Sequence, residues 1–300
     1  MNVYPFIEAV RAERGNVGRA CAMLKVSRAA YYDWARQIPS ARRRSDAAVL
    51  AKIKAIHAAS RGAYGSPRVW AQLRNDGQAC GRKRVARLMR HSGIVGRCKR
   101  RFKRTTIADP RAATTAVDLV KRSFGPGAIE IDRVWCSDVT YIRTHEGWLY
   151  LATVIDVACR RVVGWAMAGH MRAELACDAL RMAIDHRRPA PGLIFHSDRG
   201  AQYTATVFGD LLDANGIRQS LSRPGQCWDN AVAESFFATL KTELIYLHPW
   251  PARAQARNAI FEFIEVFYNR FRLHSALGYL SPEDYARRRA RLDTITTEAA

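Results

Sequence analysis

The spacing of apolar residues is helical over roughly the first hundred residues. In "GNVGRACAMLKVSRAAYYDWARQ" (15–37), apolar positions recur at helical spacing on both sides of a short turn at Lys25–Val26. Ser27 has a side chain suited to the N-cap of the second helix. The pattern predicts a helix-turn-helix outline, in which Ser27 and Arg28 at the start of the second helix would reach DNA.

A second helical module is expected to contain three more helices. They fall in "SDAAVLAKIKAIHAAS" (45–60), "YGSPRVWAQLRNDG" (64–77) and "GRKRVARLMRHSGIVG" (81–96). Pro67 suits the first turn of its helix and Gly77 a C-terminal cap. The segment before this module, "IPSARRR" (38–44), is predicted to be a basic linker.

From residue 130 the pattern changes to short strands separated by turns. A strand is predicted within 133–144, and two more within 147–169 with a turn near Cys159–Arg161. A helix over 172–187 and a short apolar strand within 192–200 follow. Helices are then expected in "TATVFGDLLDANG", "QCWDNAVAESFFATLKTEL" and "RAQARNAIFEFIEVFYNRFR". This order predicts an α/β domain.

The helix predicted within 226–244 has an apolar arc and a polar stripe. At 100° per residue, the arc collects the apolar residues Val232, Ala233, Phe236, Phe237, Leu240 and Leu244. Glu234 and Lys241 share the opposite stripe with Asn230 and Ala238, because seven residues return to within about 20° of the start. Taken alone, this stripe is most simply interpreted as a solvated face.

The positive charge is concentrated in the helical part of the chain. The 300 residues are 48% hydrophobic and 10% aromatic, as in globular proteins, and have a net charge of +21. Residues 1–110 contain 25 lysines and arginines against six acidic residues, a net charge of +19, whereas residues 111–300 have a net charge of +2. This excess predicts binding to a nucleic acid, because each neutralised phosphate releases counterions.

Targeting and metal-finger patterns are not found. The longest apolar runs are shorter than the roughly 18 residues of a membrane span, and the start "MNVYPFIEAVRAERG" has no signal-peptide core, so we expect an intracellular protein. The seven cysteines are scattered without a CxxC pair, which predicts reduced thiols and argues against a structural zinc site.

Three carboxylates stand at the ends or edges of predicted elements. Asp138 lies within the strand of 133–144, Asp198 ends the strand "LIF", and Glu234 is on the helical stripe. Each alone has a structural explanation, but together they could meet at the carboxyl end of a sheet. Such a cluster suits Mg²⁺ or Mn²⁺, and two ions about 4 Å apart can act in phosphoryl transfer.

Other polar residues have simpler interpretations. Asp156 is interpreted as structural, Asp229 as a helix cap and His196 as a core histidine. Arg199 and Gln202, beside Asp198, are candidates for positioning DNA. The segment "RFRLHSALGY" could pack the end of the domain or touch DNA, and the sequence does not separate these alternatives.

Four blocks of the chain carry a close resemblance to a known family. "WCSDVTYI", "FHSDRGAQY", "CWDNAVAESFFATLKTEL" and "YNRFRLHSALGYLSPEDY" resemble successive blocks of the DDE transposases of bacterial insertion sequences, most closely the second-frame product of the IS-three family, which is related to retroviral integrases. The 35 residues between Asp198 and Glu234 match the family's DD(35)E spacing, and Lys241 matches its following basic residue. "YGSPRVWAQLR" through "RHSGIVG" resembles the upstream helical module.

The resemblance implies a fold, a chemistry and partners. The expected fold is a ribonuclease-H-like integrase core preceded by small all-α modules. Asp138, Asp198 and Glu234 would be catalytic metal ligands for Mg²⁺ or Mn²⁺, with two ions, and Lys241 would contact terminal DNA. The expected activity exposes 3′-hydroxyls at the ends of an insertion sequence and joins them to another phosphodiester. Double-stranded DNA, a homo-oligomer on that DNA and an upstream-frame partner or fusion are the expected partners, in the bacterial cytoplasm.

The expected division of the chain follows from the same blocks and from the charge. It consists of a helical segment with a linker (1–44), a basic DNA-binding module (45–104), a connector (105–129), the catalytic core (130–287) and a tail (288–300). Besides Lys241, the residues expected to bind DNA are basic side chains of these modules and of the core: Arg28, Arg68, Arg82, Lys83, Arg84, Arg87 and Arg199.

Two other functions compete with transposition. A DNA-binding regulator would need the basic modules but not the three carboxylates. A nuclease of the same fold would share the metal site and differ only in its nucleophile, so the sequence separates it poorly. A glycosidase with paired carboxylates is a distant third, because it leaves the basic modules unexplained.

Overall fold

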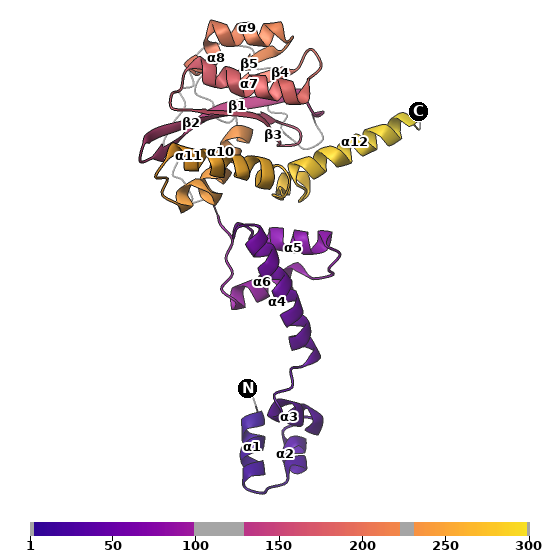
Figure 1. The fold of residues 1–300 in the computed structure, drawn as a ribbon. Helices are drawn as coiled ribbons and strands as arrows, with labels where there is room; N and C mark the ends of the chain where they lie inside the picture. Colours follow the sequence, from indigo (N-terminus) through magenta and orange to yellow (C-terminus); the bar gives the residue numbers. More distant parts are fainter. Residues whose placement is uncertain (1–2, 99–128, 223–230, 299–300) are drawn as a thin grey trace, which may run out of the picture.

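The computed structural model describes residues 3–98, 129–222 and 231–298, and a five-stranded mixed sheet forms the centre of the domain that follows residue 129 (Figure 1). The strand order is β3-β2-β1-β4-β5. The strands are β1 (Val134–Thr144), β2 (Gly147–Asp156), β3 (Val162–Ala168), β4 (Ile194–Ser197) and β5 (Arg218–Leu221). β1 to β3 form the expected antiparallel meander, and β4 and β5 run parallel to β1. β5 was not predicted, because its sequence "RQSL" is short and mostly polar.

Helices cover both faces of the sheet (Figure 1). One face packs against α7 (Ala173–Arg187), α8 (Ala201–Thr204) and α9 (Thr206–Ala214). The other packs against α10 (Ala231–Glu243), α11 (Arg253–Phe261) and the π-helical η3 (Glu262–Tyr268). The α/β architecture expected after residue 130 is therefore confirmed.

The approach of α7 to the sheet depends on one glycine. A Cβ atom added to Gly164 in β3 would lie 2.2 Å from the carbonyl oxygen of Ala179 in α7. A side chain there would force the helix away from the sheet, so β3 and α7 can pack at this distance only around glycine.

Two short turns and one long helix complete the C-terminal part of the chain. These are the 3-10 turns η2 (Ile245–Leu247) and η4 (Ser275–Leu277) and the long helix α12 (Pro282–Glu298). Among the helices of the described ranges, none combines the length and the apolar character needed to cross a membrane.

The first helical unit has its own small core. It consists of α1 (Tyr4–Ala12), α2 (Val17–Met23) and α3 (Arg28–Ala35), which bury Ile7, Ala20, Cys21 and Tyr31 together. The Ser27 hydroxyl accepts a hydrogen bond from the Ala30 amide at 3.1 Å, so it caps α3 as expected. The two helices predicted over 15–37 are present, and α1 was not predicted.

The second helical unit consists of α4 (Ala41–Ala59), α5 (Ser66–Asn75) and α6 (Arg82–His91). Pro67 lies in the first turn of α5, and Gly77 has a φ angle of +74° just after it, as expected. The linker predicted over 38–44 is wrong in its second half, because Ser40 accepts a hydrogen bond from the Arg43 amide and α4 begins at Ala41. The connector predicted over 105–129 lies outside the described residues except for its last position.

This second unit is joined to the C-terminal part of the sheet domain. The Tyr64 hydroxyl donates to the Phe271 carbonyl at 2.9 Å and accepts from the Leu273 amide at 2.7 Å. The Arg68 Nε donates to the Leu273 carbonyl at 2.9 Å. "YGSPR" therefore packs against "RFRLHSALGY", and we refer to these contacts of Tyr64 and Arg68 with residues 271–273 as the joint.

A buried ion pair lies beside the joint. The Arg272 guanidinium donates two hydrogen bonds to the Glu243 carboxylate at 2.7 and 2.8 Å, and the two side chains are 5% and 6% exposed. The pair ties the end of α10 to the segment that receives the helical unit. Removal of one partner would leave a buried charge without compensation.

We expect Glu243→Gln to lower the free energy of unfolding by about 3–5 kcal/mol, since Arg272 would stay buried without its counter-charge. Urea denaturation measures this change. Asp178→Asn is the matched control, because Asp178 pairs with Arg181 on an exposed helix face and its loss should cost less than about 1 kcal/mol. Equal effects of the two substitutions would contradict the prediction.

Candidate active site and nucleic-acid interface

Two of the three predicted carboxylates are brought together by the pairing of β1 with β4. These parallel strands pair at Val134↔Ile194, Trp135↔Phe195 and Cys136↔His196. Asp138 and Asp198 each follow the last pair by two residues. Because adjacent strands lie about 4.8 Å apart, this register places both residues at the same edge of the sheet.

The third carboxylate reaches the same edge from α10. The apolar arc predicted for this helix is buried against the sheet, with Val232, Phe236 and Leu240 each at most 4% exposed. Glu234 is exposed on the other stripe. The helix is therefore docked with its carboxylate outward, where its charge acts on Asp138.

Electrostatics show that the three carboxylates interact. The pKa of Asp138 is raised to about 7, first by burial and then by the negative charges of Asp198 and Glu234. The Val139 amide, which donates to Asp138 Oδ1 at 2.8 Å, and the positive charge of Lys241 act in the opposite direction. The surroundings of Asp138 therefore disfavour its ionised form. A cation bound beside it would favour the ionised form and lower its pKa again.

The donor set suits a hard divalent cation. Carboxylate oxygens are the preferred protein ligands of Mg²⁺, and Asp138, Asp198 and Glu234 supply three such groups. Within residues 3–98, 129–222 and 231–298, however, no three His, Cys, Asp or Glu side chains are arranged closely enough to hold an ion.

Lys241 lies beside the carboxylates, two turns after Glu234. Its Nζ is 5.4 Å from the centre of the Tyr141 ring. Burial lowers the pKa of Lys241, and the charge of Asp138 raises it. The sequence analysis missed two exposed aromatic residues here: Tyr141 is 58% exposed and contacts the 45% exposed Trp148 edge to face, 5.1 Å between ring centres. Large aromatic residues at surface positions of β1 and β2 were the available signal.

The basic residues predicted to bind DNA are distributed over the other elements. Arg199 Nε donates to the Ser222 carbonyl at 3.1 Å, next to Asp198. Arg68 belongs to the joint, where it also lies 5.9 Å from the Tyr64 ring centre. Arg28 is exposed at the start of α3, as a helix-turn-helix would have it.

The basic side chains of α6 have different surroundings, although they are close together in the sequence. Arg84 and Arg87 both form ion pairs with Asp46 of α4 at 2.7 Å, and they lower the pKa of that carboxyl. Arg82 lies over the ring of Trp70, 5.1 Å from its centre. Lys83 lines an open hollow with Arg42, Ser45, Arg84 and Arg87. The hollow keeps basic character because Asp46 offsets only one of its charges.

Asp156 and His196, which the sequence analysis interpreted as structural, are buried in the protein. Asp156 is fully buried and accepts hydrogen bonds from the Asp132 and Cys159 amides at 2.7 and 2.8 Å, a structural role. His196 is buried and its Nδ1 lies 3.0 Å from the Ser220 hydroxyl. Gln202, which was predicted as a candidate for positioning DNA, is only 9% exposed, and that role stays a prediction. Asp229 lies outside the described residues.

Family models match most of the described chain. An integrase core domain model matches residues 130–227, a second integrase core domain model matches 215–282, and an HTH-like domain model matches 44–102. These matches confirm the ribonuclease-H-like integrase fold expected for the sheet domain and show an HTH-like domain over residues 44–102. The helix-turn-helix predicted over 15–37 lies outside the matched residues and stays a prediction.

Relatives match over nearly the whole length. An insertion element IS600 uncharacterized 31 kDa protein of Shigella sonnei is 41% identical over 87% of this chain and 95% of its own. Transposase InsF for insertion sequence IS3A of Escherichia coli is 37% identical over 94% of this chain and 97% of its own. Among solved structures, the catalytic core domain of BIV integrase covers 56% of this chain and 99% of its own, with 17% identity and a TM-score of 0.41.

We expect Asp138→Asn to stabilise the metal-free protein at pH 8. An acid whose folded pKa is raised from about 4 to about 7 loses stability as pH rises through that interval, and the penalty is complete above it. The substitution should therefore raise the free energy of unfolding in EDTA by about 1–3 kcal/mol at pH 8, and by less at pH 5. Urea denaturation at both pH values measures the difference. A variant less stable than the wild type at pH 8 would contradict this origin of the shift.

Proposed function

We propose the following chemistry for this chain, which belongs to the IS-three family of DNA transposases. A transposase that is 37% identical over 94% of the chain, together with integrase core and HTH-like domains, supports DNA cleavage and strand transfer. Nothing observed favours the alternative of a regulator without catalysis.

The catalytic residues in this proposal are Asp138, Asp198 and Glu234. The observation that carries it is their placement at one end of the paired strands, where burial first, and then the charges of Asp198 and Glu234, raise the pKa of Asp138 to about 7. We propose that they hold Mg²⁺ or Mn²⁺, as two ions, and that the metal when bound would stabilise charge on the oxygens of the reacting phosphodiester.

The protein's own groups orient this site. The Val139 amide fixes Asp138 Oδ1, and the Gly200 amide donates to Asp198 Oδ1 at 3.0 Å. Lys241 on the stripe of Glu234 would bind a phosphate of the terminal DNA. In each step an oxygen of water or of a 3′-hydroxyl bonds to phosphorus, and the opposite 3′ P–O bond breaks. In cleavage, water attacks, the element's 3′ oxygen leaves as a hydroxyl, and the flanking DNA keeps a 5′-phosphate. In joining, that 3′-hydroxyl loses its proton and its oxygen bonds to a target phosphorus, while the target's own 3′ oxygen leaves and takes up a proton.

The helical units would hold the DNA that the carboxylates cut. The chain binds DNA, and the basic hollow of α4 and α6 and the exposed Arg28 of α3 are our candidates for phosphate contacts. We further propose that two or more copies assemble on paired element ends in the bacterial cytoplasm. An upstream-frame partner or fusion would supply additional recognition of those ends.

We expect Asp138→Asn, Asp198→Asn and Glu234→Gln each to abolish cleavage and joining of labelled element ends in Mg²⁺, while binding of the ends changes less than about threefold. Each substitution removes a metal ligand but leaves the basic helical units intact. A gel assay of cleaved and joined strands, with and without EDTA, measures activity, and anisotropy measures binding.

Asp178→Asn, on the exposed face of α7, is the matched control and should retain activity. Cleavage by any of the three variants would exclude that residue as a required ligand. Hydrolysis without joining by the wild type would instead favour a nuclease.

Lys241→Ala should weaken binding of element ends and make it less dependent on salt. Because a lysine that neutralises one phosphate releases counterions, its removal reduces the slope of log K against log salt by about 0.9. Anisotropy titrations between 50 and 200 mM salt measure the slope. Lys241→Arg keeps the charge and should restore most of it; an unchanged slope in Lys241→Ala would rule out the interaction.

A further inference from the structure

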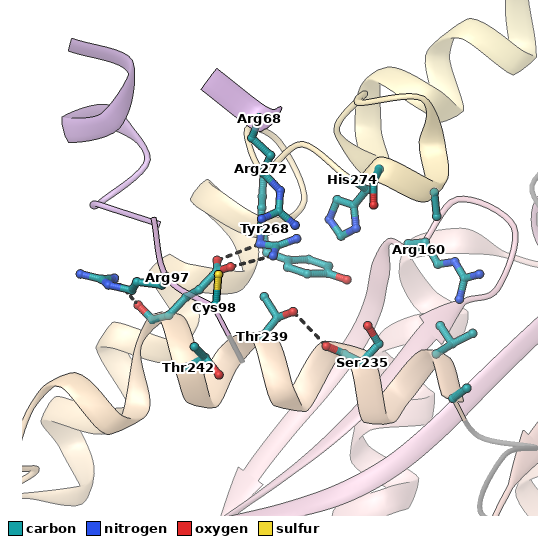
Figure 2. A pocket seen from close by; sticks show the side chains of 15 residues that line it. Arg68, Arg97, Cys98, Arg160, Ser235, Thr239, Thr242, Tyr268, Arg272 and His274 are labelled. Carbon is teal, nitrogen blue, oxygen red and sulfur yellow. Dashed lines mark hydrogen bonds and ion pairs between the residues drawn. The ribbon is translucent and has the colours of Figure 1, made fainter. Parts of the chain in front are cut away.

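A polar cavity of about 540 Å³ lies beside the joint, on the flank of α10 (Figure 2). Its wall includes Ser235, Thr239 and Glu243 of α10, and Figure 2 shows the side chains of Arg68, Arg160 and His274 across from that helix. The cavity therefore collects side chains from the second helical unit, the β2–β3 turn and the C-terminal segment.

The cavity has an excess of positive charge. Four arginines line it, namely Arg68, Arg97, Arg160 and Arg272, against the single carboxylate of Glu243. That carboxylate is engaged by both hydrogen bonds of Arg272. Burial and the nearby Arg272 lower the pKa of Arg68, so the charged form of this guanidinium is disfavoured in the protein alone. An anion in the cavity would reverse this penalty.

A buried nitrogen in the wall is left without a hydrogen bond. His274 Nε2 is inaccessible to solvent and has no partner among the described residues, and the ring packs edge to face on Tyr268 at 4.9 Å. Burial and the charges of Arg272, Arg68 and Arg160 hold the pKa of His274 well below its usual range, so the ring is neutral. In the tautomer protonated at Nε2, it can donate a hydrogen bond to an oxygen once the ring turns far enough for that oxygen to reach the nitrogen, which no water-sized sphere touches in the free protein. An unsatisfied buried group of this kind destabilises the protein until it finds a partner.

The position of the cavity connects it to the site of the carboxylates. Ser235 directly follows Glu234, and both residues are on exposed faces of α10. One helix thus presents Glu234 and Lys241 on one stripe and the cavity wall on the next, about 100° around its axis. A DNA strand that leaves the carboxylates along this flank would meet the cavity before the second helical unit.

We propose that this cavity binds one backbone phosphate of the element-end DNA, through Arg68, Arg160 and His274. The proposal rests on the function proposed above and adds a second anchor for the same DNA. Bidentate arginines and a neutral imidazole donor match a phosphodiester, whose two free oxygens accept hydrogen bonds. The phosphate would bridge the helical unit and the core, so that both are fixed on the DNA together.

The test combines substitutions in the protein with DNA in which one backbone phosphate is replaced by an uncharged methylphosphonate. Element-end duplexes, each with a single methylphosphonate at a different position, are titrated by anisotropy against the wild type, Arg160→Gln and His274→Phe. For the wild type, one position outside the cleaved bond should weaken binding about tenfold, a decrease typical of a charge-assisted hydrogen bond. Arg160→Gln should bind unmodified DNA about tenfold more weakly and show no further decrease at that position.

Two controls separate this site from its surroundings. Arg161→Gln changes the neighbouring arginine of the same turn, which does not line the cavity, and should keep the tenfold decrease. His274→Phe keeps the ring that packs on Tyr268 and removes the unsatisfied nitrogen. It should weaken DNA binding while leaving the melting temperature of the free protein unchanged or higher, which a purely structural role would not do.

The outcomes distinguish the two proposals. Equal methylphosphonate effects at every position in the wild type and in Arg160→Gln would overturn the cavity site. Stabilisation of the wild type but not of Arg160→Gln by inorganic phosphate, without any position-specific effect, would assign the cavity to a free anion and also overturn it. A position-specific effect that vanishes in Arg160→Gln, in a protein that does not cleave, would contradict only the proposed catalysis.

Discussion

The structure depends on a parallel pairing of only three residues between β1 and β4. This short ladder sets the register of the two strands, and their pairing with each other ends two residues before Asp138 and two residues before Asp198. A shift of one residue would turn one of these side chains to the other face of the sheet. The helices packed on both faces of the sheet hold this ladder in place. The position of Asp138 beside Asp198 therefore depends on the packing of the surrounding core.

Helix α10 connects the parts of the molecule. Its apolar arc is part of the core of the sheet domain, its polar stripe carries Glu234 and Lys241, and its last turn carries Glu243. The ion pair of Glu243 with Arg272 then fixes the segment on which Tyr64 and Arg68 dock. A displacement of the second helical unit is thus felt by the same helix that positions a carboxylate.

Local sequence patterns predicted the helices and strands, but they did not predict the contacts between residues far apart in the chain. The strands of the meander, the buried arc of α10 and the cap at Ser27 follow from periodicity and residue type, which act within one element. The pairing of Asp46 with Arg84, 38 residues apart, and that of Tyr64 with Leu273, 209 residues apart, depend on how elements meet. The meeting of Asp138 with Asp198 was expected chiefly through the family resemblance, because the strand register cannot be read from either segment alone.

Helix α4 is the longest helix among the described residues, and its length separates the first helical unit from α5 and α6. Its 19 residues span about 28 Å, somewhat less than one turn of B-DNA. In Figure 1 the three-helix unit α1–α3 stands at one end of this rod and α5 and α6 gather toward the other. An insertion or deletion of one residue in α4 would change the length of the helix by only about 1.5 Å, but it would turn the point at which the chain from α1–α3 enters the helix by about 100° about its axis. The number of residues in α4 therefore sets the direction of that entry far more strongly than it sets the distance between the two ends of the helix.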